Sequence, residues 1–263
     1  MKLINLIVLF TIITGCESIV DFPKAPKANE YPVIEALLTN RDEVQKVRVS
    51  YTTSLEDSVS SRVVDNAMVF VCSDAGDTSV YHYTENGWYA SAPYYANTGK
   101  IYTLNVNIGN VSYKATGSLI SMNGIDSVYT RRLEVVGKDS AYFAFINAGV
   151  VDPSVPRYYQ IDAYKNDSLL TGGINIAVFY DKYLTSLIGI NLPFAFSQKD
   201  TVDLQLYSLS QTMFNYYQSL SINIFSLSFV NSGYRSNPPA MFSPFALGYF
   251  QVSAVDRKQI IIR

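Results

Sequence analysis

The dense series of short β-strand patterns in the N-terminal half constrains the fold of this chain most strongly. Over residues 47–51 and 102–108, apolar and polar side chains alternate with the period of two that marks a strand with one buried face. Asn86-Gly87, between two further apolar runs, is a hairpin signal. About seven such strands within about 85 residues are typical of a sandwich, so we expect an immunoglobulin-like or transthyretin-like β-sandwich over residues 32–117.

A second strand-rich region follows a joint at about residues 118–125. Residues 158–163 and 202–206 again alternate between apolar and polar side chains. Ser208 and Gln211 have the spacing of a helical capping box, and apolar residues recur at helical intervals after them. We therefore expect a mainly β protein whose second β-rich domain, residues 118–263, carries one helix at about 208–220.

The N-terminal segment has the pattern of an export signal that ends at Cys16. Lys2 precedes an apolar run that is shorter than the roughly 20 residues needed to span a bilayer. Residues 13–16 resemble a lipobox, at which a bacterial lipoprotein is cleaved and the new N-terminal cysteine is acylated. The alternative is an ordinary secretory signal that contains a cysteine. We expect a signal peptide over residues 1–15, lipidation at Cys16 and an extended, Pro-containing tether over residues 16–31.

Composition and motifs argue against several functional classes. A formal net charge of −2 without a basic stripe argues against a nucleic-acid partner. Cys72 lies in an apolar run and is expected to be a small buried residue. The single histidine, His82, lies on a predicted strand, and no nucleophile elbow, zinc-ligand cluster or phosphate-binding glycine loop occurs. We expect no cofactor, no metal and no catalytic residues, although the 22 acidic residues leave open a carboxylate-based glycan-active enzyme.

Two features are candidates for binding. Tyr89, Tyr94 and Tyr95 are candidate aromatic contacts, because aromatic side chains on loops stack on sugars or anchor a protein partner. The alternative is that these tyrosines belong to strands or to the core. Tyr234 and Arg235 lie in the Asn-, Ser- and Pro-rich loop 231–244, which is either a binding loop or a structural crossover.

Several short motifs follow one another in a fixed order along the chain: Cys16-Glu17, residues 32–40, residues 66–69, residues 99–104, residues 202–204, Tyr216-Tyr217, residues 246–250, Ser253-Ala254 and Arg257-Lys258. In this order they resemble a Bacteroidota family of outer-membrane lipoproteins described only as domain of unknown function 4249. The resemblance implies an outer-membrane lipid anchor and genes encoded beside TonB-dependent receptors. It assigns no catalytic residues.

Taken together, these patterns predict a lipid-anchored accessory or binding protein of the outer membrane. Its expected partner is a TonB-dependent transporter or another outer-membrane β-barrel. A structural or adhesive surface lipoprotein without a transporter is the alternative, and a glycan-active enzyme is a further one. The sequence does not decide between the cell surface and the periplasmic face. It slightly favours the surface, because Glu17 and Asp21 near Cys16 form part, but not all, of the acidic run typical of surface export.

Overall fold

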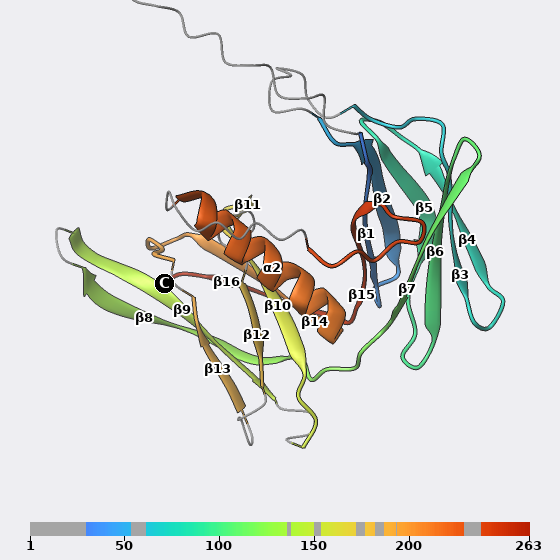
Figure 1. The fold of residues 1–263 in the computed structure, drawn as a ribbon. Helices are drawn as coiled ribbons and strands as arrows, with labels where there is room; N and C mark the ends of the chain where they lie inside the picture. Colours follow the sequence, from blue (N-terminus) through green and yellow to red (C-terminus); the bar gives the residue numbers. More distant parts are fainter. Residues whose placement is uncertain are drawn as a thin grey trace, which may run out of the picture.

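The computed structural model describes residues 30–53, 62–135, 138–149, 154–171, 177–181, 187–192, 194–228 and 238–263. Cys16, Tyr234 and Arg235, with the predicted signal peptide and nearly all of the tether, lie outside the described residues. Within the described ranges the chain forms three β-sheets and the helix α2 (Gln211–Ser228). The expectation of a mainly β fold is therefore confirmed (Figure 1).

The largest sheet has eight strands in the order β15-β1-β2-β5-β4-β3-β6-β7. These strands are β1 (Pro32–Thr39), β2 (Glu43–Tyr51), β3 (Met68–Ser73), β4 (Thr78–Tyr83), β5 (Trp88–Tyr94), β6 (Ile101–Ile108), β7 (Val111–Ser118) and β15 (Leu247–Ser253). The sheet curls until its two edges meet, and a Cβ atom added to Gly117 of β7 would lie 2.8 Å from Cγ2 of Val252 of β15. The N-terminal strands, together with β15, therefore form one nearly closed, barrel-like sheet. The expected immunoglobulin-like or transthyretin-like sandwich is not confirmed.

The C-terminal strand β15 completes this barrel. It runs parallel to β1, with residues 33–39 opposite residues 247–253. A stretch of chain that the sequence assigns to the second domain, 118–263, therefore lies in the sheet of the first. Parallel neighbours need a long connection, and no turn marks their pairing in the sequence.

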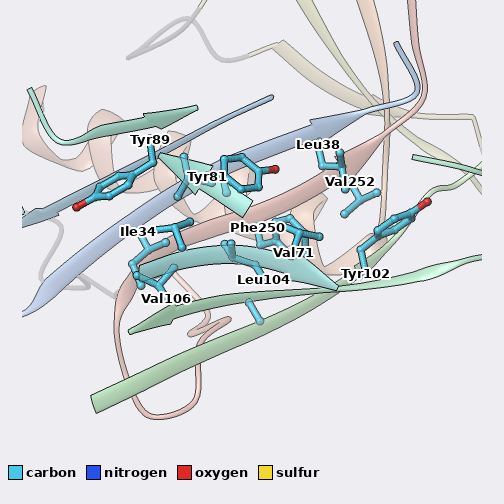
Figure 2. Packing of buried hydrophobic residues seen from close by; sticks show 14 of the residues in the cluster. Ile34, Leu38, Val71, Tyr81, Tyr89, Tyr102, Leu104, Val106, Phe250 and Val252 are labelled. Atoms are coloured by element: carbon cyan, nitrogen blue, oxygen red, sulfur yellow. The ribbon is translucent and has the colours of Figure 1, made fainter. Parts of the chain in front are cut away.

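The barrel interior is apolar in the middle and carries phenol hydroxyls toward its ends. Ile34, Leu104 and Val106 are fully buried in it. In Figure 2 the hydroxyl of Tyr89 points toward one side of this cluster, and the hydroxyls of Tyr81 and Tyr102 point toward the opposite side. A buried tyrosine keeps a partner for its polar tip, and the ends of the barrel provide such partners.

The other two sheets pack face to face. One contains β10 (Tyr158–Lys165), β11 (Ser168–Leu169), β12 (Ala177–Tyr180), β14 (Thr201–Leu209) and β16 (Val255–Ile261). The other contains β8 (Ile125–Val135), β9 (Lys138–Gly149) and β13 (Leu187–Asn191). Ile146 of β9 shares a core with Ile161 of β10 and Leu204 of β14. The alternation that the sequence predicts for residues 158–163 and 202–206 is confirmed, since their apolar members are buried here.

Helix α2 begins at Gln211, so its cap lies two residues later than predicted, and the helix extends beyond residue 220. The Oγ of Ser210 accepts the N–H of Met213 at 3.2 Å, as an N-cap side chain does. The Oγ of Ser208 instead accepts the N–H of Ala254 at 2.9 Å, so the capping role assigned to Ser208 was wrong. The helix packs on the five-stranded sheet and also reaches β15, where the ring centroid of Tyr217 lies 6.1 Å from that of Tyr249.

Candidate functional site

A hollow of about 300 Å³ opens at one end of the barrel. This end carries the β1–β2 turn, the β3–β4 turn and the β5–β6 loop. The volume lies at the lower limit of the roughly 300–1,000 Å³ found for small-molecule sites. Its lining combines aromatic, hydroxyl and charged side chains: Asp42, Val71, Ser73, Asp77, Ser79, Pro93, Tyr94, Tyr95, Asn97, Lys100 and Tyr102.

Tyr94, in the wall of the hollow, is linked to further hydroxyl groups inside the barrel. The hydroxyls of Tyr81 and Tyr94 share a hydrogen bond of 2.6 Å, and Ser79 also bonds to Tyr94. Burial raises the pKa of Tyr94 to about 12 and places that of Tyr81 higher still. Both phenols therefore stay neutral at physiological pH, and Tyr94, which lines the hollow, keeps a hydroxyl group that both donates and accepts.

A third phenol, Tyr102, closes the side of the hollow next to the β5–β6 loop. Its side chain is buried, because the alternation of β6 turns residues 102, 104 and 106 into the barrel. The Tyr102 hydroxyl accepts the backbone N–H of Asn97 at 2.7 Å. Since a phenol both accepts and donates, the Tyr102 O–H proton remains for a further bond.

An ion pair forms part of the rim. The Nζ of Lys100 lies 3.1 Å from Oδ2 of Asp77. Ser73 donates its hydroxyl to the same carboxylate oxygen at 3.2 Å and accepts the backbone N–H of Asp77 at 3.3 Å. The hydrogen bond from Lys100, with that from Ser73, lowers the pKa of Asp77, and the same bond raises the pKa of Lys100. Both groups are therefore ionised, and each already has its counter-charge.

Two of the three predicted aromatic contacts meet in the hollow. Tyr94 is half-buried in its wall, whereas Tyr95 stands at its mouth with 49% of its surface exposed. Tyr89, by contrast, is 1% exposed, donates its hydroxyl to the carbonyl of Val64 and accepts the N–H of Ala67, both at 2.9 Å. Its assignment as a ligand contact was wrong, because the alternation of β5 directs residue 89 into the barrel.

The structure also corrects one expectation outside the hollow and adds residues to the site. Cys72 is only half-buried, on the outer face of β3, with Sγ 3.5 Å from Oγ1 of Thr78. Tyr102, Asp77 and Lys100 were not singled out from the sequence. In the sequence, these three residues are marked only by their positions in or next to the β3–β4 turn and the β5–β6 loop. The pairing of β3 with β4 and β6 then brings them together at this end of the barrel.

No metal-binding cluster of three or more His, Cys, Asp or Glu side chains occurs within the described part of the chain. No helix among those residues has the length and apolar character that a membrane crossing needs.

Comparison with known protein families gives a match over most of the chain. The family model described as domain of unknown function 4249 matches residues 20–259. A comparison with curated proteins gave no match. The matched region includes every strand of the barrel, helix α2 and the strands of the two packed sheets except for the last two residues of β16. The chain therefore belongs to the domain of unknown function 4249 family.

Proposed function

We propose that this protein is a lipid-anchored binding protein of the outer membrane. It receives a ligand in the hollow and acts beside a TonB-dependent transporter or another outer-membrane β-barrel. The lipobox-like sequence that ends at Cys16 supports the anchor, and the motif order that resembles Bacteroidota lipoproteins supports the partner. The observation that carries the proposal is the position of the hollow relative to the start of the folded chain.

Strand β1 begins at Pro32, at the barrel end remote from the hollow, and ends at Thr39 beside it. The carbonyl of Thr39 accepts the N–H of Ala96, the residue after Tyr95, at 2.8 Å. The eight residues of β1 are separated by seven rises of about 3.3 Å, so about 23 Å lie between its two ends. A lipid on Cys16 would therefore be connected to the barrel end opposite the hollow, so the anchor would not cover the ligand site.

The ionisation of Asp77 favours binding over glycoside hydrolysis. A glycosidase needs one carboxylic acid whose pKa is raised, so that it protonates the leaving group. Asp77, which lines the hollow, has a lowered pKa because of Lys100 and Ser73. This carboxylate is therefore poorly suited to the role of general acid.

Purification of the natively tagged lipoprotein from detergent-solubilised outer membranes of its host tests the proposal. We expect a large β-barrel protein to copurify with the wild-type chain. A Cys16→Ser variant should lose both membrane retention and the barrel. Membrane retention of that variant would contradict lipid anchoring. Recovery of the wild-type lipoprotein alone would contradict the transporter partner and favour a structural or adhesive protein.

A further inference from the structure

We infer that the hollow binds an uncharged, hydroxyl-rich ligand of the size of a short saccharide. This inference rests on the proposed binding role of the hollow and names the chemical class of its ligand. It follows from three properties of the lining residues: their charge balance, the type of their polar groups and the placement of one exposed ring.

The charge balance favours a neutral ligand. The positive group among the lining residues, Lys100, is already paired with Asp77 at 3.1 Å, so an anion would have to compete with a carboxylate that is part of the protein. A cation would have to compete with Lys100 for the same carboxylate. Asp42 is the remaining charged group of the lining, and it is exposed to solvent, where its attraction for a cation is screened.

The polar groups match the hydroxyls of a sugar. Tyr94, Tyr102, Ser73 and Ser79 each present a hydroxyl, and Asn97 presents an amide. All of these groups both donate and accept hydrogen bonds. A sugar hydroxyl does the same. It can accept the remaining O–H proton of Tyr102, and it can donate to Ser73, whose own proton already bonds to Asp77. A carboxylate or phosphate only accepts and an ammonium only donates, so either would match only some of these groups.

Tyr95 supplies an apolar face at the mouth of the hollow. Almost half of its surface is exposed, and Pro93 and Val71 add further apolar surface to the lining. A pyranose ring carries its C–H groups on its faces and its hydroxyls at its edge. It can therefore stack on Tyr95 while its hydroxyls reach the phenols below. The volume of about 300 Å³ limits the enclosed part to about one or two rings.

Binding assays on the full-length acylated protein test the ligand class. The protein is purified in a detergent without a sugar head group, because a maltoside detergent would itself be a ligand of the proposed class. Isothermal titration calorimetry and saturation-transfer NMR then measure binding of maltotriose, cellotriose, xylotriose and tri-N-acetylchitotriose. Choline serves as the cationic probe and acetate as the anionic probe, and both are small enough to enter the hollow.

We expect at least one neutral trisaccharide to bind and neither charged probe to do so. Because the ligand is uncharged, its Kd should not change when the salt concentration rises from about 0.05 to 0.5 M. Tyr95→Ala should weaken binding about tenfold, as the loss of an aromatic anchor does at other sites. Tyr129→Ala is the matched control, since Tyr129 is an exposed tyrosine on β8 of another sheet, and it should leave the Kd unchanged.

The inference is overturned if choline or acetate binds with a dependence on Tyr95, or if none of the four trisaccharides binds at about 50 mM. Equal weakening by Tyr95→Ala and Tyr129→Ala would also overturn it. These assays use the isolated protein, whereas the barrel partner is tested by copurification. Failure of the ligand class is therefore distinguished from failure of the proposed function.

Discussion

The parallel pairing of β1 and β15 predicts an unusually large effect for the substitution Gly248→Ala. Gly248 has a φ of +103°, and an added Cβ would lie 1.9 Å from the carbonyl oxygen of Ile34, its partner in the parallel ladder. Backbone strain at positive φ costs about 1–2 kcal/mol, and overpacking a tight contact costs about 1–3 kcal/mol. Alanine stiffens the unfolded chain and returns about 0.4–1 kcal/mol. The net loss in the free energy of unfolding should be about 2–4 kcal/mol.

A matched control separates the clash from the strain. Gly76, in the β3–β4 turn, has a similar φ of +94°, but no atom lies within 4 Å of its added Cβ. Gly76→Ala should therefore cost only about 1 kcal/mol. Urea unfolding followed by far-UV circular dichroism measures both variants. At an m value of about 3 kcal/mol/M, Gly248→Ala should lower the midpoint by about 1 M, and Gly76→Ala by much less. Equal losses in the two variants would refute the close contact between β1 and β15.

Four further predictions follow from the same contacts. Tyr89→Phe removes the hydroxyl that bonds to Val64 and Ala67, so thermal denaturation should show a loss of about 1–3 kcal/mol, and an unchanged melting temperature would contradict those bonds. Arg257→Ala leaves the buried carboxylate of Asp203 without its paired hydrogen bonds, so urea unfolding should show a loss of about 1–3 kcal/mol. Arg62→Ala breaks the exposed ion pair with Glu30 and should cost less than about 1 kcal/mol. The pKa of Tyr94 is about 12 in the folded chain and near 10 in the unfolded chain, so the folded state binds more protons between these pH values. The free energy of unfolding should therefore fall as the pH rises from about 10 to 12. Unfolding curves recorded across this range should show a shallower decline for Tyr94→Phe. A fragment of residues 30–118 lacks β15 and with it the buried Phe250 and Val252, each worth about 1.5–3 kcal/mol, so its amide NMR spectrum should be that of an unfolded or aggregating chain.

The sequence contains most of the information about which strands form and which of their faces are buried. The alternation over residues 102–108 correctly places Tyr102, Leu104 and Val106 inside the barrel, because a strand with one buried face selects apolar side chains at every second position. The same rule, applied to Tyr89, would have placed this residue in the core and not at a surface. Local patterns therefore predict burial better than they predict ligand contacts.

The candidate site was only partly predictable, because it depends on how strands lie beside one another. Tyr94 and Tyr95 were two of the three predicted aromatic contacts. Asp77, Lys100 and Tyr102 join them only through the strand order β5-β4-β3-β6. Likewise, Ser208 and Ser210 both precede the helix, and the sequence alone does not show which one is the cap. Ser208 is engaged by Ala254, which is 46 residues away, and such a contact leaves no local signature.

The contacts around Ala254 explain why the barrel and the packed sheets do not divide at residue 118. The chain leaves the barrel as β15 and enters the five-stranded sheet as β16 within two residues, so Ala254 lies where the two sheets meet. Ser208 of β14 fixes this crossing: its N–H donates to the carbonyl of Ala254 at 3.0 Å, and its Oγ accepts the N–H of Ala254 at 2.9 Å. Ser253 donates its hydroxyl to the carbonyl of Ser208 at 2.6 Å, and all three residues are buried. Because breaking these bonds would leave buried polar groups unpaired, the crossing should hold the two parts together, and a force applied to β1 through the N-terminal tether would pass through β15 into the five-stranded sheet.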